Sequence, residues 1–226
     1  MAVREPPVAL IVFGAGSATG AAIVEAFRRR TGRPVIAVRR RPPSTPDGHG
    51  VRGAVCDALD RAAVGALFDD APADAAVVTV LGGKPGDAVL VDDVGNRNVI
   101  DAAGPQRHVV LVTSLGCGDT AELVSPRLRQ AIGGILDAKT RAEDHLRRTN
   151  GRFTILRPGG LMEGERTGTA ELSETSTASG MIMRADLAAL IVDVLLDDSH
   201  RGRVYGAIDP HLRPPPRTAG HSDPAT

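Results

Sequence analysis

The sequence has no excess of charge of either sign, because its 226 residues include 27 Lys and Arg against 27 Asp and Glu. A balanced chain of this kind has no overall electrostatic attraction to nucleic acid or to an anionic membrane, so we expect neither partner. The sequence also lacks any apolar run longer than a β-strand. Its start carries Arg4, Glu5, Pro6 and Pro7, where a signal peptide needs an uninterrupted hydrophobic stretch. These absences predict a cytoplasmic protein.

Cysteine is scarce as well, with only Cys56 and Cys117 in the chain. The two do not have the spacing of metal ligands, and neither His108 nor His145 has a companion ligand at such spacing, so no metal site is expected. The simplest interpretation of both cysteines is that they are small buried hydrophobic residues in a compartment that keeps thiols reduced.

What the sequence does contain is an alternation of short apolar runs with helical segments. Strands are predicted at residues 8–13, 34–38, 51–56, 75–81, 108–113, 153–156 and 203–208, and helices at 60–68, 89–103, 136–148 and around 187–195. The alternation predicts an α/β fold of the Rossmann type, with a doubly wound, mostly parallel sheet flanked by helices in a single domain.

Two later stretches differ from the alternating pattern. Residues 157–183 are polar and rich in Gly, Ser and Thr, so we expect them to be irregular or only partly in strand and to cover the substrate. Residues 211–226 are rich in proline and predict a disordered tail, which leaves residues 1–210 as the folded domain.

The first strand runs into a glycine-rich loop and then a helix, in the stretch VALIVFGAGSATGAAIVEAFRRR. Its glycines, Gly14, Gly16 and Gly20, do not have the spacing of the two commonest dinucleotide-binding patterns. Their place between a first strand and a helix is nevertheless where a parallel sheet binds ligands, and the helix N-terminus there favours anions. The loop is therefore predicted to hold the pyrophosphate of a dinucleotide.

The end of the second strand distinguishes between two dinucleotides. A protein that prefers NAD usually has an acidic residue there to bind the ribose hydroxyls, but no acid occurs between Glu25 and Asp47. Arg39, Arg40 and Arg41 follow the strand instead, and guanidinium groups can bind a 2′-phosphate. The sequence thus favours NADP(H), with Arg39 or Arg40 making the contact.

A series of motifs from residue 8 to about 210 is similar to one known family. The motifs are FGAGSATG, VRR, GAVCDALD, VVTVLGG, VTSLGCG, KTRAEDHLRRTNGRFTILRPGGL and RADLA. Together they resemble the atypical short-chain dehydrogenase/reductases, in the NAD(P)H-binding branch that includes NmrA-like proteins and the flavin and biliverdin-IXβ reductases. The resemblance implies an NADP-dependent oxidoreductase acting on a small molecule, as a monomer or a homodimer.

The resemblance also implies roles for individual residues. Those that would contact the cofactor are Gly14, Gly16, Ser17, Ala18, Thr19 and Gly20 at the phosphates, Arg39 and Arg40 at the 2′-phosphate, Asp57 and Ala58 at the adenine, Leu81, Gly82 and Gly83 along the ribose, Thr113 beside the nicotinamide, Lys139 at the nicotinamide ribose, and Arg157, Pro158 and Gly159 over the nicotinamide. Ser114 and Lys139 would be the catalytic residues. Ser17 departs from the pattern, since many relatives carry a glycine there.

The chain lacks the Tyr-x-x-x-Lys pair of typical short-chain dehydrogenases, in which the tyrosine protonates the carbonyl as hydride arrives. Ile135 precedes Lys139 by four residues, and the single tyrosine, Tyr205, is followed four residues later by Asp209. A reductase of this sequence would act on conjugated carbonyls, quinones or flavins, which accept hydride without strong acid assistance.

Alternatives remain open at this point. The protein could be a redox sensor of the NmrA-like type that binds NADP(H) without catalysis, and a sugar-nucleotide epimerase or dehydratase ranks last because the tyrosine is missing. Ser114 could be a local turn cap, and Lys139 could lie on a solvated helix face paired with Glu143. Cys117 has no paired base nearby in sequence, so a nucleophilic role is not expected.

Overall fold

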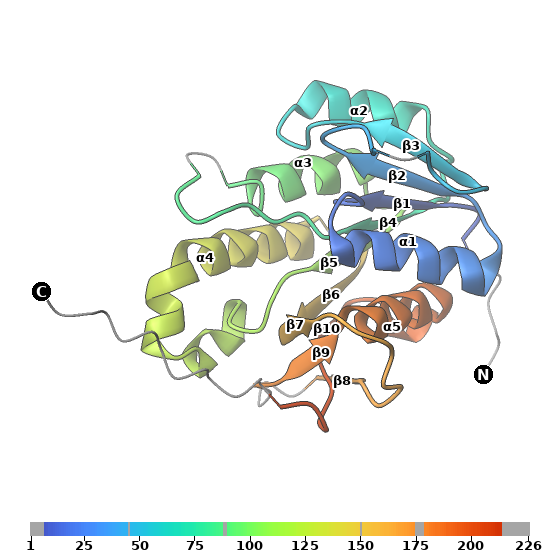
Figure 1. The fold of residues 1–226 in the computed structure, drawn as a ribbon. Coiled ribbons are helices and arrows are strands. Elements are labelled where there is room, and N and C mark those ends of the chain that lie inside the picture. The colour runs from blue at the N-terminus through green and yellow to red at the C-terminus, as the bar shows by residue number, and fades with distance from the viewer. Residues whose placement is uncertain (1–6, 45, 88–89, 150, 175–178, 214–226) are drawn as a thin grey trace, which may run out of the picture.

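The computed structural model describes residues 7–44, 46–87, 90–149, 151–174 and 179–213. The expected disordered tail at 211–226 lies almost wholly outside this range. Within the described chain, eight strands form one sheet in the order β3-β2-β1-β4-β5-β6-β10-β8. Every neighbouring pair is parallel except β10 and β8, which are antiparallel. The prediction of a doubly wound, mostly parallel sheet is confirmed, and Figure 1 shows its helices on both faces.

The strands of the sheet are β1 (Leu10–Phe13), β2 (Val35–Arg39), β3 (Val51–Val55), β4 (Ala76–Thr79), β5 (His108–Val112), β6 (Arg152–Pro158), β8 (Glu171–Ser173) and β10 (Arg203–Ile208). Strand order reverses between β1 and β4, because β2 and β3 extend the sheet on one side of β1 while β4, β5 and β6 extend it on the other. A reversal of this kind opens a crevice at the carboxyl ends of the strands, where ligands bind in such folds.

Two hydrophobic layers hold the helices against the sheet. In strand β1, Leu10 and Val12 point to one layer, shared with α1 (Ala18–Thr31) and α5 (Arg184–Leu196). Ile11 and Phe13 point to the other layer, shared with α2 (Arg61–Asp69), α3 (Val94–Ala103) and α4 (Pro126–Arg148). All four side chains of β1 are buried, which explains why the sequence of this strand is a continuous apolar run.

The predicted start of α4, at residue 136, is wrong, because the helix begins at Pro126. Ser125 caps the helix by accepting a hydrogen bond from the Leu128 amide, and proline is favoured at the first helical position. Residues 126–131 are exposed, so this part of the helix has no apolar stripe that would mark it in the sequence. A short 3₁₀ helix, η1 (Gly118–Leu123), precedes it and was not predicted.

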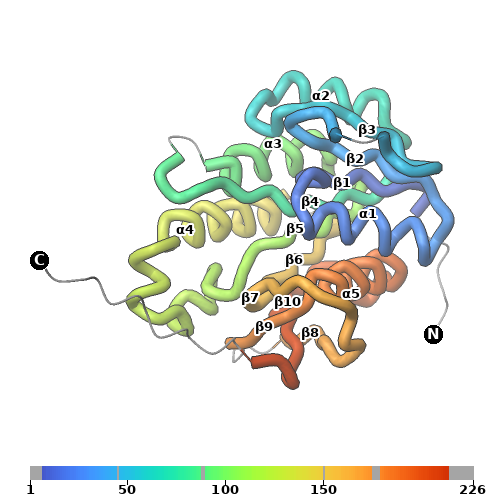
Figure 2. The backbone as a smooth tube through the Cα atoms, viewed as in Figure 1, coloured from blue at the N-terminus to red at the C-terminus, as the bar shows by residue number. Residues whose placement is uncertain are grey.

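The polar stretch after β6 is partly in strand, as expected. It contains β7 (Gly160–Met162), β8 and β9 (Met181–Met183), and β7 pairs with β9 in a separate two-stranded parallel sheet. A second 3₁₀ helix, η2 (Asp198–His200), connects α5 to β10. The backbone trace in Figure 2 shows these strands gathered beside α5, at the β6 end of the molecule. No helix in the described part of the chain is long and apolar enough to cross a membrane.

Candidate functional site

A cleft of about 880 Å³ lies at the carboxyl ends of the parallel strands. Its walls come from the residues that end β1, β2, β4 and β5 and from the loops that follow, including Gly14, Arg39, Val80 and Thr113. Helix α4 adds Lys139, the end of β6 adds Pro158, and β7 adds Leu161. A volume of this size lies within the range of about 300–1,000 Å³ that is typical of small-molecule and cofactor sites.

The glycine-rich loop between β1 and α1 is held in one conformation by its own hydrogen bonds. Gly14 adopts a φ of 88°, which favours glycine, and a Cβ on Gly20 would lie 2.2 Å from the Gly14 carbonyl oxygen. The Ser17 hydroxyl donates to the Gly14 carbonyl at 2.8 Å and accepts from the Gly20 amide at 3.1 Å. Ser17 is thus the N-cap of α1, which gives a physical reason for a serine where many relatives have glycine.

At the end of β2 the three arginines have different surroundings. Arg39 is engaged with Asp47 through two hydrogen bonds, of 3.0 and 2.5 Å, and both side chains are largely buried. Arg40 and Arg41 are exposed, line the cleft and have no ion-pair partner in the described chain. The guanidinium of Arg39 is therefore partly neutralised within the protein, while those of Arg40 and Arg41 are available to an anion.

Asp57 and Ala58, after β3, line the same end of the cleft. The Asp57 carboxylate accepts a hydrogen bond of 3.0 Å from the Leu59 amide, and the carbonyl of buried Ala58 accepts one of 2.9 Å from Asn98. These contacts fix the turn that leads into α2, whose N-cap is Asp60. Asp57 itself remains exposed beside the cleft.

Lys139 is held across the cleft wall by Asp92, a fully buried residue just before α3 that the sequence did not single out. Its Nζ lies 2.9 Å from Asp92 Oδ1 and donates to the Leu81 carbonyl at 3.2 Å. The other Asp92 oxygen accepts from the Gly83 amide at 2.7 Å. The solvated-face interpretation of Lys139, with Glu143 as its partner, is therefore wrong, because only 12% of the Lys139 side chain is exposed and its carboxylate is Asp92.

Thr113 and Ser114 follow β5 and both line the cleft. The Thr113 hydroxyl donates to Glu143 at 2.7 Å, which directs its proton into the protein interior. Ser114 is half-buried. Cys117, in the same loop, is fully buried, and burial together with the nearby Glu143 charge raises the pKa of its thiol to about 11. A thiol that stays protonated at neutral pH is a poor nucleophile.

The role predicted for Arg157, covering the nicotinamide, is wrong. Its guanidinium does not line the cleft, and only 3% of the side chain is exposed. It binds Glu143 and Asp119 instead. Burial alone lowers the pKa of an arginine, but the hydrogen bonds and charges of these two carboxylates outweigh it and raise the pKa. The carboxylates of buried Glu143 and exposed Asp119 thus hold the Arg157 side chain away from the cleft.

Most of the predicted site residues meet in this one cleft. Fourteen line it: Gly14, Gly16, Ser17, Thr19, Arg39, Arg40, Asp57, Ala58, Leu81, Gly82, Thr113, Ser114, Lys139 and Pro158. The structure does not bring Ala18, Gly20, Gly83, Arg157 and Gly159 to its surface. Gly20 packs beneath Gly14, and Gly159 packs against Gly180, where a Cβ would lie 2.2 Å from the carbonyl oxygen.

The cleft also includes residues that the sequence did not indicate. They are mainly apolar side chains beside the predicted positions and the start of the loop after β2, namely Phe13, Ala15, Val38, Pro42, Pro43, Ser44, Cys56, Leu59, Val80, Val91 and Val112. Adjacency to the strand ends could have identified most of them. Tyr205 lies on β10, outside the lining, with its hydroxyl 2.9 Å from His200 Nδ1. The described residues contain no group of three or more His, Cys, Asp or Glu that could hold a metal ion.

Three comparisons with known proteins bear on this site. The description "NAD(P)H-binding" belongs to a family whose model matches residues 14–198. Among solved structures, ChuY, an anaerobillin reductase from Escherichia coli O157:H7, is 34% identical with a TM-score of 0.81, and the match covers 92% of this chain and all of ChuY.

Two plant proteins are also similar. An uncharacterized chloroplastic protein of Arabidopsis thaliana is 29% identical over 86% of this chain and 74% of its own length. Sanguinarine reductase of Eschscholzia californica is 34% identical over 51% of this chain and 44% of its own length. The cleft, the fold and these matches agree with the motifs that suggested atypical short-chain dehydrogenase/reductases, and the chain belongs to the NAD(P)H-binding family as an NAD(P)H-dependent oxidoreductase.

Proposed function

We propose that the protein is an NADPH-dependent reductase that transfers hydride to a conjugated carbonyl, a quinone or a flavin-type acceptor. The observation that carries the proposal is the arrangement of the cleft. Arg40 and Arg41 follow β2 and have no ion-pair partner in the described chain. A capped glycine-rich loop lies at the centre of the cleft, and Ser114 and Lys139 come after β5. An extended dinucleotide needs these groups in this order.

The preference for NADPH rests on charge. Arg40 and Arg41 are exposed at the cleft and have no ion-pair partner in the described chain, so a 2′-phosphate there would supply their counter-charge. Arg39 packs behind them against Asp47, and its aliphatic stem lies 3.7 Å from the position of a Cβ on Gly16, beside the glycine-rich loop. Asp57 and Ala58 would then border the adenine.

The centre of the cleft is suited to a pyrophosphate. The first amides of a helix have no partner within the helix, and the positive end of the helix dipole favours anions there. Of the first amides of α1, the Ser17 hydroxyl accepts a hydrogen bond from that of Gly20. Gly14 and Gly16 keep the backbone bare on the cleft side, so the phosphates can approach it closely.

At the reacting end, Lys139 would bind the ribose and Ser114 would hydrogen-bond the acceptor. The nicotinamide, when bound, supplies the hydride. The Thr113 hydroxyl already donates to Glu143, so Ser114 is the hydroxyl of this pair that can donate to a substrate. Because Tyr205 lies outside the cleft, water would supply the proton, and acceptors that delocalise the arriving electron pair are favoured.

The similar proteins support a reductase. ChuY is an anaerobillin reductase, and the Eschscholzia californica relative is a sanguinarine reductase. Pro158 and Leu161 add apolar surface to the same cleft as Ser114, and we expect the described residues of 157–174 and 179–183 to cover the acceptor. This surface is consistent with a flat, largely apolar substrate.

The test is NADPH oxidation by the purified protein against a panel of flavins, quinones and α,β-unsaturated carbonyls, for the wild type and two serine variants. We expect Ser114→Ala to lower kcat by about tenfold, the order of one lost hydrogen bond to the reacting group, while Kd for NADPH stays within about twofold. Ser199→Ala, an exposed serine outside the cleft, is the matched control. Tight NADPH binding without turnover of any panel member would refute the reductase and favour a sensor.

A further inference from the structure

A buried ion pair lies directly behind the reacting end of the cleft. Glu143, in the last two turns of α4, is fully buried, and Arg157, near the end of β6, is 3% exposed. The guanidinium binds both carboxylate oxygens, with Nε donating to Oε1 at 3.0 Å and Nη2 donating to Oε2 at 2.6 Å. Such a two-point contact between planar groups fixes distance and orientation together.

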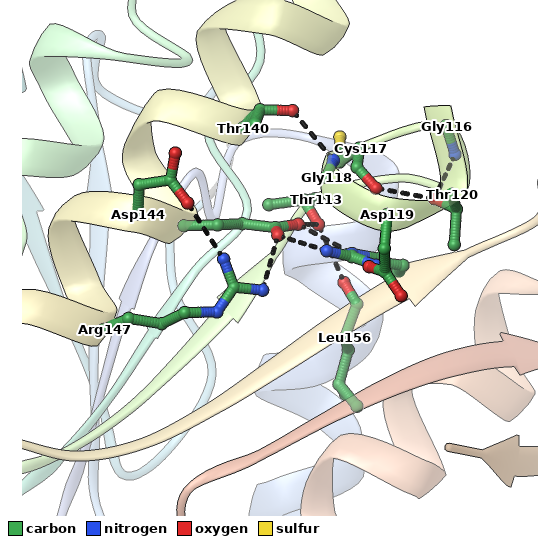
Figure 3. Close-up of polar contacts among 12 residues, drawn as sticks. Thr113, Gly116, Cys117, Gly118, Asp119, Thr120, Thr140, Asp144, Arg147 and Leu156 are labelled. Atoms are coloured by element: carbon green, nitrogen blue, oxygen red, sulfur yellow. Dashed lines mark hydrogen bonds and ion pairs between the residues drawn. The ribbon is translucent and has the colours of Figure 1, made fainter. Parts of the chain in front are cut away.

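The pair joins segments that are distant in sequence. The Thr113 hydroxyl, after β5, donates to Glu143 Oε1 at 2.7 Å, and Arg147, on the next turn of α4, donates to Oε2 at 3.1 Å. Asp119, on η1, accepts from Arg157 Nη1. Figure 3 shows these contacts converging from the helix, the strand and the loop.

The loop after Ser114 is built on top of the Arg157 guanidinium. Gly118 has a φ of 54°, and a Cβ there would lie 2.3 Å from Arg157 Nη2, so the backbone crosses the guanidinium at a place where only glycine fits. The Gly118 amide donates to Thr140 on α4 at 3.0 Å, and the Gly116 amide donates to Thr120 at 2.8 Å. These hydrogen bonds fix the backbone of the loop at Gly116 and at Gly118.

None of Glu143, Arg157 and Asp119 lines the cleft, although Thr113 and Ser114 do. Burying an ion pair gives little stability compared with apolar side chains of the same volume, because both charges lose their hydration. A pair of this kind is better explained by the geometry that it imposes. Here the imposed geometry is that of the residues between Thr113 and Thr120.

We propose that Glu143 and Arg157, with Asp119, are positioning residues that hold Ser114 and Thr113 in place against the nicotinamide end of the cleft. The inference rests on the proposed reductase function. Loosening the pair should slow hydride transfer, because displacing a reacting group by about 1 Å can cost on the order of a hundredfold in rate. Cofactor affinity should hardly change, because the arginines and the glycine-rich loop that would bind the phosphates belong to other elements.

The variant that tests this is Asp119→Asn. Its side chain is 66% exposed and keeps its size, so the fold should survive, while Arg157 loses one charged partner. We expect kcat to fall by about tenfold with Kd for NADPH within about twofold. The control is Asp137→Asn, which removes the charge from an exposed Arg129–Asp137 pair on α4, the helix that carries Glu143, and should leave both values unchanged.

Arg157→Lys is the second variant, since lysine keeps the charge but cannot form the two-point contact. Reduced kcat in both variants, with NADPH binding and melting temperature retained in Asp119→Asn, supports the proposal. Unchanged kcat in Asp119→Asn overturns it. If the wild type binds NADPH but reduces no acceptor, the proposed function fails separately. The fluorescence of bound NADPH then decides: altered nicotinamide emission in Asp119→Asn at unchanged Kd supports positioning, and identical emission overturns it.

Discussion

Cofactor selectivity should depend on Arg40 and on the pairing of Arg39 with Asp47. Arg40 is exposed at the cleft with no ion-pair partner in the described chain, so Arg40→Ala removes a guanidinium that is free to bind a phosphate. A hydrogen bond to a charged group contributes about 1.5–3 kcal/mol, and about 1.4 kcal/mol corresponds to tenfold in affinity. We therefore expect Arg40→Ala to weaken NADPH binding by about ten- to a hundredfold and NADH binding by less than about twofold.

Asp47→Asn should have the opposite effect. Asp47 binds the Arg39 guanidinium through two hydrogen bonds, of 3.0 and 2.5 Å, and places a negative charge near the proposed phosphate position. Removing one charge near a protein surface changes an electrostatic energy by about 1 kcal/mol, so NADPH should bind about fivefold more tightly, with a smaller gain at high salt. NADH binding should not change.

The assay is isothermal titration of each variant with NADPH and with NADH at two salt concentrations. Arg52→Ala, another exposed arginine, on the neighbouring strand β3 and outside the cleft lining, is the control. Equal losses for both cofactors in Arg40→Ala, or weaker NADPH binding in Asp47→Asn, would show that the 2′-phosphate lies elsewhere.

Three further predictions concern the loop, the lysine and the buried thiol. Gly20→Ala should lower the melting temperature, because its Cβ would lie 2.2 Å from the Gly14 carbonyl oxygen. Gly16→Ala, whose Cβ would meet no atom closer than 3.7 Å, should leave the melting temperature unchanged. Equal melting temperatures for the two variants would contradict the loop geometry. Lys139→Met should weaken NADPH binding by about tenfold, whereas Lys84→Met, an exposed lysine outside the cleft lining, should not; calorimetry of both measures the difference. Because burial raises the Cys117 pKa from 9.0 to about 11, the unfolded thiol ionises first, so stability present below pH 9 is lost as the pH rises toward about 11. Denaturant titrations should show this loss as about 3 kcal/mol relative to Cys117→Ala, and parallel pH profiles would contradict it.

The parts of the molecule that follow from local pattern were predictable. Continuous apolar strands, the glycine-rich loop after β1 and the arginines after β2 identified the sheet and one whole wall of the cleft. Each of these signals lies within a few neighbouring residues, and the sheet topology then brings the strand ends together.

The parts that depend on distant partners were not predictable. Asp92 reaches Lys139 from the loop before α3, and Arg157 is drawn from the cleft by Glu143 and by Asp119. In the sequence Lys139 and Glu143 resemble an exposed i, i+4 pair, and only the packing of α4 against α3 and β6 gives each a separate buried partner. The first turns of α4 were missed for a related reason, since an exposed helix end carries no apolar periodicity.

The central claim is that the protein catalyses hydride transfer from NADPH without a tyrosine. It is tested most directly by mixing the wild-type protein, NADPH and a conjugated acceptor under anaerobic conditions and measuring NADPH consumed and acceptor reduced. The proposed function predicts one acceptor reduced for each NADPH oxidised, at a rate that falls in Ser114→Ala and not in Ser199→Ala. NADPH that binds tightly and is never consumed, across flavins, quinones and unsaturated carbonyls, would contradict it.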